Sequence, residues 1–261
     1  TKDDIVIVPA FGAPIDELRD LHNIGCTLVD TICGSVINVW KRVEKYAEEG
    51  FTSIIHGKYY HEETLATSAQ VLQYPGGQYL IVFDNDEAQY VCDYILHGGN
   101  KEEFLEKFKL AISPGFDPDK HLKSVGLANQ TTMLSSESLF IADMIKKALI
   151  EKNGADKIDA HFRSFDTICS ATQERQDAII DMKDLKPDLT VVIGGYNSSN
   201  TSNLFRISRQ YSQSYHIDRA ECIQDGKTLR HKPFGEKEEV IAKDWLPKGD
   251  FSIGITAGAS T

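Results

Sequence analysis

A short apolar, β-branched segment followed by glycine or proline, a polar loop and a helical period recurs along this chain. The apolar segments span residues 5–8, 53–55, 191–193 and 253–255. Strands that alternate with helices in this way indicate an α/β protein whose sheets are mainly parallel. In such folds ligands bind beyond the carboxyl ends of the strands, so a site is expected in the polar loops that follow these segments.

Apolar residues spaced three and four apart predict helices whose apolar faces form the core. One such stripe lies within residues 36–47 and a second within residues 139–149. The residues expected in the core are Val36, Val39, Trp40, Val43 and Ala47 in the first stripe and Leu139, Ile141, Met144, Ile145 and Leu149 in the second.

Composition argues against a membrane protein and against a nucleic-acid-binding protein. The chain has 261 residues, enough for one large or two ordinary domains. No apolar run approaches the roughly 18 residues that a membrane span needs, so a membrane protein is not expected. The 28 basic and 39 acidic residues leave a net charge of -11, which would repel nucleic acid phosphates but is compatible with a basic redox partner.

The chain has five cysteines and no secretory signal, which argues against a disulfide scaffold and for reduced thiols. We therefore expect a reducing compartment. The chain opens on Thr1 instead of methionine and runs at once into an apolar segment. Its natural beginning, with any targeting segment, is expected to have been removed.

The tetrapeptide Asp-Thr-Ile-Cys occurs twice, at residues 30–33 and 166–169. Each copy precedes small residues and a helical segment, so we expect Cys33 and Cys169 at strand ends that face helix starts. The amides and dipole of a helix N-terminus favour the thiolate, which binds iron or acts as a nucleophile. Buried structural cysteines are the alternative for either copy alone, but the repetition favours a functional pair. The cysteines expected to be core or incidental residues are Cys26, Cys92 and Cys222.

The loop at residues 56–64 carries imidazole, ammonium, phenol and carboxylate groups directly after an apolar segment. Such a density at the carboxyl end of a strand suits proton transfer and anion binding. His61 could bind phosphate and Glu63 could deliver a proton. An ordinary helix start with glutamates in its first turn is an equally good interpretation. The spacing matches no standard zinc signature, so zinc is not expected.

A third polar loop, at residues 194–201, reads Gly-Gly-Tyr-Asn-Ser-Ser-Asn-Thr. Glycine lets the backbone approach a ligand, and hydroxyls, amides and helix-start N–H groups together suit a diphosphate. Serine and asparagine are also common helix caps, which is the alternative. Residues 254–260 form a similar loop, and residues 129–132 (Asn-Gln-Thr-Thr) could place hydroxyls beside a substrate or cap a helix.

Together these motifs resemble the 4-hydroxy-3-methylbut-2-enyl diphosphate reductases, the last enzymes of the non-mevalonate isoprenoid pathway, in their plant and cyanobacterial branch. The resemblance covers essentially the whole chain. It implies similar α/β lobes with small, mainly parallel sheets in a pseudo-threefold arrangement around a central 4Fe-4S cluster. The lobes would span residues 1–33, 34–165 and 166–261. The motifs that carry the resemblance lie at residues 30–33, 61–63, 130–132, 167–176, 197–201 and 254–260.

The resemblance also implies roles for individual residues. The cluster would be held by Cys33, Cys169 and a third cysteine in an N-terminal part that this chain lacks. Glu63 and Thr131 would manage the proton. The residues implied to bind the substrate, chiefly its diphosphate, are His61, Thr132, Asn197, Ser198, Ser199, Asn200 and Ser260.

The implied reaction is the reductive dehydroxylation of (E)-4-hydroxy-3-methylbut-2-enyl diphosphate to isopentenyl and dimethylallyl diphosphates. A ferredoxin or flavodoxin would donate electrons, in the bacterial cytoplasm or the plastid stroma. Phe11 stands where many bacterial members have a histidine, so the resemblance does not carry that diphosphate contact over to this chain. Two alternatives stay open: a cluster-free diphosphate-binding fragment without activity, and a metal-free α/β transferase that uses Ser198 and Ser199. We expect activity from the complete protein and not from these 261 residues alone.

Overall fold

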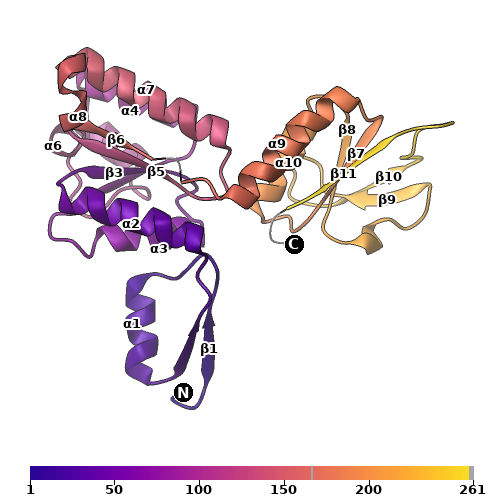
Figure 1. Ribbon diagram of the computed structural model, residues 1–261, viewed down its shortest axis with the longest axis horizontal. Helices are drawn as coiled ribbons and strands as arrows, with labels where there is room; N and C mark the ends of the chain where they lie inside the picture. The colour runs from indigo at the N-terminus through magenta and orange to yellow at the C-terminus, as the bar shows by residue number, and fades with distance from the viewer. Residues whose placement is uncertain (166, 259–261) are drawn as a thin grey trace. The chain divides into compact units, whose positions relative to one another are not determined.

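The computed structural model describes residues 1–165 and 167–258 (Figure 1). Its contacts divide the chain into two compact units. Unit 1 consists of residues 1–131 and 135–168, and unit 2 consists of residues 132–134 together with the chain from Cys169 onward. Each unit has its own parallel sheet and its own hydrophobic core.

Unit 1 begins with a small βαβ element. The strands β1 (Ile5–Val8) and β2 (Thr27–Asp30) pair in parallel, and α1 (Ile15–Ile24) connects them. Helix α1 follows Pro14 with acidic residues in its first turn, which suits the helix dipole, and ends at Gly25 in the left-handed conformation. No residue along the described length of α1 is buried, so this element adds little to the core of the unit.

The main sheet of unit 1 has four parallel strands in the order β4, β3, β5, β6. These strands are β3 (Thr52–His56), β4 (Tyr79–Val82), β5 (Val125–Asn129) and β6 (Phe162–Ser164). The helical segments are α2 (Gly34–Glu48), α3 (Glu62–Val71), α4 (Asn85–His97), α5 (Lys101–Lys107), α6 (Pro118–His121), α7 (Ser135–Asn153), η1 (Ala155–Lys157) and α8 (Ile158–His161). Helices α4 and α7 cover one side of the sheet, and α2 and α3 cover the other (Figure 1).

The central strands β3 and β5 are buried along their whole length, as expected of parallel strands covered on both faces. Gly126 in β5 leaves room for the ring of Tyr46 on α2, because a Cβ at this position would lie 2.5 Å from ring carbons. The Tyr46 hydroxyl donates to the carbonyl of Leu127 at 2.8 Å. This contact fastens α2 to the middle of the sheet.

The structure confirms most of the predicted core faces. Leu139 is wrong, because its side chain is 56% exposed. It lies two residues before the buried Ile141, about 200° around the helix from it, and therefore faces away from the core. The predicted residues that are buried are Val36, Val39, Val43, Ile141, Ile145 and Leu149, and those that are half-buried are Trp40, Ala47 and Met144.

Unit 2 has a three-stranded parallel sheet in the order β11, β7, β8. The strands are β7 (Leu189–Ile193), β8 (Gln213–Ile217) and β11 (Ile253–Ala257). Helices α9 (Ser170–Leu185) and α10 (Ser199–Ser208) pack on each other and on the sheet. Helix α10 starts directly after the polar loop that follows β7, as the sequence predicts.

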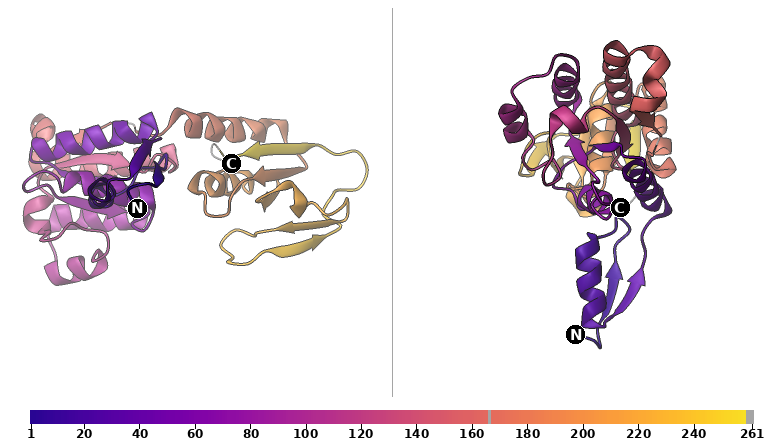
Figure 2. Two further views of the ribbon diagram at one scale, coloured as in Figure 1. Left: turned by 90° about the horizontal axis from the view of Figure 1, so that it is seen from below. Right: turned by 90° about the vertical axis from the view of Figure 1, so that its left-hand side faces the viewer.

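An antiparallel hairpin of β9 (Thr228–His231) and β10 (Val240–Lys243) follows β8 through the short helix η2 (Ala220–Cys222). It is visible beside the sheet of unit 2 in Figure 1 and in the left view of Figure 2. The amide of Lys232, just after β9, donates to the carbonyl of His216 in β8 at 3.0 Å. The hairpin is therefore bonded directly to the sheet.

These elements confirm the predicted α/β class with small, mainly parallel sheets. The boundaries of the three lobes and their pseudo-threefold arrangement around a cluster stay predictions. Within the two described stretches of chain, no helix combines the length and apolar character needed to cross a bilayer.

Candidate functional site

Both copies of the repeated tetrapeptide end at a helix start. Cys33 is the N-cap residue of α2, with φ -65° and ψ 137°, and Cys169 is the N-cap residue of α9, with φ -64° and ψ 132°. The carbonyl of Cys33 accepts from the amide of Ile37 at 3.1 Å, and that of Cys169 accepts from Gln173 at 2.9 Å. Each cysteine therefore stands at the positive end of a helix dipole. This placement is confirmed, while iron binding stays a prediction.

The threonine of each copy ties its loop to the end of a neighbouring strand. Thr31 Oγ1 donates to the carbonyl of Val8 at the end of β1, and Thr167 Oγ1 donates to the side chain of Asn129 at the end of β5. Asp166, which opens the second copy, lies outside the described residues. Both cysteine loops are thus held at the carboxyl ends of parallel strands, where α/β folds bind ligands.

The donor chemistry of these two thiols fits iron. Cys33 is exposed and Cys169 is half-buried, and all five cysteines lie among the described residues. Cys92 is buried in the core of unit 1, where burial raises the pKa of the thiol to about 12. Cys222 is buried in unit 2, which confirms a core position. Cys26 lies immediately before β2 instead of within the strand, and its thiol donates to a backbone carbonyl.

His61 caps α3 with its imidazole ring. Its Nδ1 accepts the amide N–H of Glu63 at 3.2 Å, which assigns the proton of the neutral ring to Nε2. Burial lowers the pKa of His61, and the nearby ammonium of Lys58 lowers it further. The ring is therefore neutral near pH 7, and its Nε2–H is a donor suited to a phosphate oxygen.

Glu63, in the first turn of α3, is only 2% exposed. Its Oε1 accepts from the amide of Thr131 at 2.5 Å, and its Oε2 accepts from the Thr131 hydroxyl at 3.0 Å. Burial raises the pKa of this carboxyl to about 7, although the two bonds from Thr131 lower it. A carboxyl that titrates near neutrality can give up and regain a proton under working conditions, as a general acid must. The structure thus brings the two predicted catalytic residues into direct contact.

Two neighbours complete this part of unit 1. Gln130 Oε1 accepts from the amide of Lys58 at 3.2 Å and from the hydroxyl of Thr64 at 3.3 Å, which joins the loops after β5 and β3. The ring of Phe11 lies edge-on to that of His61, with centroids 6.4 Å apart. Because a phenyl ring has no N–H to donate, His61 has an apolar neighbour in place of a second imidazole donor.

In unit 2 the predicted anion loop connects β7 to α10. Ser198 is the N-cap residue of this helix, and its Oγ accepts from the amide of Thr201 at 3.3 Å, which leaves the hydroxyl proton for a ligand. The amides of the first turn add positive charge. Ser199 is buried at the first helical position, and Asn197, just before the cap, is exposed.

Asn200 is 2% exposed, and neither polar atom of its side-chain amide has a hydrogen-bond partner among the described residues. The hydroxyl of the adjacent Thr201 is likewise without a partner in that part of the chain. Leaving a buried polar group unpaired costs roughly 1–3 kcal/mol, so it requires an explanation in a native protein. A ligand that pairs with this amide supplies one.

Thr132 belongs to unit 2, whereas the preceding Thr131 belongs to unit 1. The carbonyl of Thr132 accepts from Asn203 Nδ2 on α10 at 3.0 Å, so the segment packs with the helix that follows the anion loop. Ser260 lies outside the described residues. The roles of both residues in substrate binding stay predictions.

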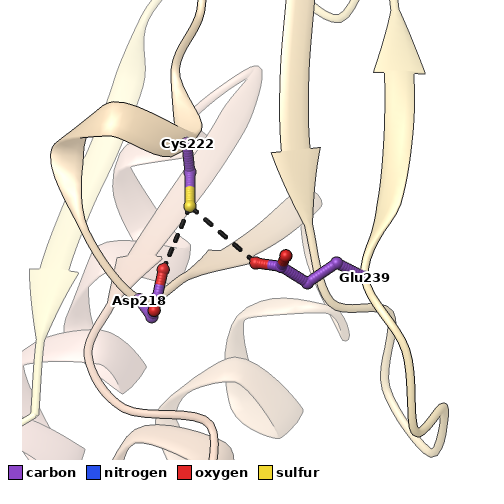
Figure 3. Close-up of side chains that lie close together, drawn as sticks. All are labelled: Asp218, Cys222 and Glu239. Atoms are coloured by element: carbon purple, nitrogen blue, oxygen red, sulfur yellow. Dashed lines mark hydrogen bonds between the residues drawn. The ribbon is translucent and has the colours of Figure 1, made fainter.

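The sequence pattern missed a polar cluster that follows β8 (Figure 3). Cys222 Sγ donates to Asp218 Oδ1 at 3.1 Å and lies 4.0 Å from Glu239 Oε1. The three ligand atoms lie within 4.8 Å of one another, close enough to share a metal ion. Each carboxylate already has a cationic partner, since Arg219 lies 2.7 Å from Asp218 and Arg230 lies 3.2 Å from Glu239. No spacing motif marks this cluster.

The family model described as LytB protein matches residues 1–261. Curated relatives carry the name 4-hydroxy-3-methylbut-2-enyl diphosphate reductase. Those of Thermosynechococcus vestitus and Rippkaea orientalis are 52% and 54% identical over 259 residues, covering 99% of this chain and 63% of each relative. That of Synechocystis sp. is 51% identical over 261 residues and covers 100% of this chain and 67% of the relative. The chain thus spans about two thirds or less of the length of these relatives.

Two solved structures have a similar fold. The E-1-hydroxy-2-methyl-but-2-enyl-4-diphosphate reductase from Plasmodium falciparum matches with a TM-score of 0.64 at 19% identity, over 98% of this chain and 63% of that one. A structure titled as (E)-4-hydroxy-3-methyl-but-2-enyl diphosphate reductase, the terminal enzyme of the non-mevalonate pathway, matches with a TM-score of 0.50 at 23% identity, over 99% of this chain and 71% of that one. At these identities the likeness is evidence of fold alone.

Proposed function

Because this chain belongs to the LytB protein family, we propose that the protein of which it forms part is a 4-hydroxy-3-methylbut-2-enyl diphosphate reductase. The names of the curated relatives support this proposal, as does the agreement of the site with the residue roles implied by the motifs. The substrate would be (E)-4-hydroxy-3-methylbut-2-enyl diphosphate, and the products would be isopentenyl and dimethylallyl diphosphates.

The reaction breaks the C–O bond of an allylic alcohol. Two electrons enter the allyl system, one proton converts the departing hydroxyl to water, and a second proton adds to carbon to complete either alkene isomer. The diphosphate is retained and serves as a handle. Such a site therefore needs an electron source, a proton donor and an anion cradle.

Cys33 and Cys169 would hold two irons of the cluster, and we place the third cysteine ligand in the part of the whole protein that this chain does not span. When bound, a 4Fe-4S cluster supplies low-potential electrons and an iron that can act as a Lewis acid toward the hydroxyl oxygen. A ferredoxin or flavodoxin would reduce the enzyme, in the bacterial cytoplasm or the plastid stroma.

The observation that carries the proposal is the buried pair of Glu63 and Thr131. With a pKa of about 7, the Glu63 carboxyl is partly protonated at neutral pH and can release its proton at Oε2 to the Thr131 hydroxyl, with which it is bonded at 3.0 Å. That hydroxyl can then pass on its own proton. The pair thus holds a proton out of water until the C–O bond breaks.

The donors that we propose for the diphosphate are neutral groups in each of the two units, with the ammonium of Lys58 near His61. His61 offers Nε2–H, Ser198 offers a hydroxyl proton, and Asn200 offers an amide that is buried without a partner among the described residues. The helix N-terminus of α10 adds its amides.

The test uses the whole protein under anaerobic conditions. We expect iron and sulfide in equal amounts, an electron paramagnetic resonance signal after reduction with dithionite, and consumption of the hydroxylated diphosphate. A whole protein that holds no cluster and consumes no substrate would refute the proposal. Binding of diphosphate without a cluster or turnover would instead favour the non-catalytic alternative.

A further inference from the structure

The anion loop of unit 2, residues 194–198 between β7 and α10, is held by contacts that its predicted role in binding a diphosphate does not explain. His216 on β8 bonds to the loop's first residue, and Tyr196 within the loop bonds to Glu239 next to the hairpin. We call Tyr196, His216 and Glu239 the loop clamp. His216 and Glu239 lie outside every motif in the sequence. Their bonds to the loop therefore point to a role other than direct ligand binding.

His216 holds the start of the loop. His216 is only 4% exposed, and its Nε2 lies 2.8 Å from the carbonyl oxygen of Gly194. Because a carbonyl can only accept, the proton of the ring is on Nε2. Burial lowers the pKa of His216, so the ring is neutral and keeps this single tautomer. Gly194 itself has φ 143°, a backbone conformation that suits glycine.

Tyr196 holds the middle of the loop. Its ring is edge-on to that of His216, with centroids 4.9 Å apart, and its hydroxyl donates to Glu239 Oε1 at 2.6 Å. Burial raises the pKa of Tyr196 far above its usual range, so the phenol stays protonated and continues to donate. The tyrosine is thereby fixed at both its ring and its hydroxyl.

Glu239 is itself held in place. Arg230 Nε lies 3.2 Å from Glu239 Oε2, and Arg230 Nη2 lies 3.7 Å from the sulfur of Cys222. Figure 3 shows Glu239 pointing toward Cys222 and Asp218, with its carboxylate next to the sulfur. The carboxylate that receives the tyrosine hydroxyl is therefore preorganised by the hairpin side of unit 2.

We propose that the loop clamp positions the anion loop for the diphosphate, an inference that rests on the proposed function of that loop. Tyr196 directly precedes Asn197 and the capping Ser198, so fixing the tyrosine fixes the two residues that follow. Gly195, within the loop, is exposed, and a Cβ at this position would meet nothing within 4 Å, so packing does not fix the backbone there. Without the clamp, binding would have to order the loop, which weakens affinity. Tyr196, His216 and Glu239 are positioning residues.

The experiment compares Tyr196→Phe, Glu239→Ala, Glu239→Gln and the double variant Tyr196→Phe/Glu239→Ala in the whole protein. The probe is inorganic pyrophosphate, titrated by calorimetry, and steady-state turnover of the hydroxylated diphosphate is measured alongside. The matched control is Glu238→Ala, which removes an exposed carboxylate one residue away.

Tyr196→Phe and Glu239→Ala should each weaken pyrophosphate binding by about fivefold, the usual worth of one hydrogen bond. KM should rise in parallel with kcat unchanged, because the diphosphate is bound equally in the ground and transition states. The double variant should bind pyrophosphate no more weakly than either single variant, since each single variant already breaks the same Tyr196–Glu239 hydrogen bond. Glu239→Gln keeps an acceptor for the phenol and should bind like the native protein, as should Glu238→Ala.

Native affinity in both Tyr196→Phe and Glu239→Ala would overturn the clamp while leaving the diphosphate site intact. Additive losses in the double variant would also overturn it. Failure of the unmodified whole protein to bind pyrophosphate and the substrate would overturn the proposed function of the loop itself. Thermal unfolding checks that each variant is folded, and if Glu239→Ala is not, the comparison of Tyr196→Phe with Glu239→Gln decides.

Discussion

Replacing Glu63 with glutamine should raise the free energy of unfolding above that of the native protein, and this gain should be larger at pH 8 than at pH 5. The side chains have the same shape, and glutamine can keep both contacts to Thr131. Its Oε1 can accept from the Thr131 amide, and its Nε2 can donate to the Thr131 hydroxyl, which is able to accept as well as to donate. The substitution therefore removes the titration of Glu63 and little else.

The magnitude follows from the pKa of Glu63, which burial raises from 4.5 to about 7 in the folded protein. Each pKa unit between the folded and unfolded states corresponds to about 1.36 kcal/mol, so the ionised carboxylate destabilises the fold by about 3 kcal/mol. The pKa is raised on folding, so the native state binds more protons than the unfolded state between these two values. The associated stability is complete below pH 4.5 and is lost as the pH rises through about 7.

Urea unfolding of the native protein and of Glu63→Gln at several pH values measures this difference. The free energy of unfolding of the variant should gain about 3 kcal/mol on the native protein between pH 4.5 and pH 8. The control is Glu62→Gln, whose side chain is exposed in the same helical turn and whose effect should not vary with pH. Turnover of Glu63→Gln in the whole protein should fall by about 100-fold or more, as for loss of a general acid. A constant difference in stability across this pH range, or near-native turnover with the cluster intact, would refute the role given to Glu63.

Four further substitutions test the site. His61→Asn keeps a good helix cap but removes the Nε2–H donor. The free energy of unfolding should change by less than about 0.5 kcal/mol, while calorimetry should show pyrophosphate binding about tenfold weaker. Unchanged binding would contradict the role of His61 as a donor to the diphosphate. Asn200→Leu replaces a buried amide that has no partner among the described residues with an apolar group. Thermal unfolding should show equal or greater stability, and the affinity for pyrophosphate should fall by about tenfold. Lower stability with unchanged affinity would instead indicate a structural role for Asn200. Cys33→Ser and Cys169→Ser should each abolish the resonance signal of the reduced cluster in the whole protein, whereas Cys26→Ser keeps it; a signal retained in the first two variants would exclude them as ligands.

The parts of the fold that depend on local sequence could be predicted. Four apolar segments became β1, β3, β7 and β11, because β-branched residues favour extended strands. Strands β3 and β7 are buried along most of their length, as strands covered on both faces must be, whereas β1 and β11 expose several of their residues. Both cysteines stand at helix starts because small residues and a helical period follow each of them. Leu139 was misplaced because the apolar spacing alone does not define the edge of a buried helical face.

The chemistry of the site depends on contacts between distant parts of the chain. Glu63 has its unusual pKa because the fold buries it, and its hydrogen-bond partner Thr131 lies 68 residues away in the chain. The hydroxyl of Tyr196 bonds to Glu239, which lies 43 residues further along the chain. Glu239 directly precedes β10, in a hairpin whose two strands have four residues each. Residue type and spacing identified Glu63, Thr131 and the anion loop as candidates, but the protonation state of His61 and the loop clamp required the folded structure.

The N-cap position of both cysteines has a consequence for how this protein can evolve. Helix starts favour serine, threonine, aspartate and asparagine, whose oxygens bind the amides of the first turn, and neither Cys33 nor Cys169 caps its helix with its side chain. Each of the two helices thus forgoes about 1 kcal/mol that a single substitution to serine or aspartate could restore. The fold alone therefore gives no reason for a cysteine at either helix start. If both thiols hold iron, as we propose, this protein gives up helix stability at two positions in exchange for its cofactor.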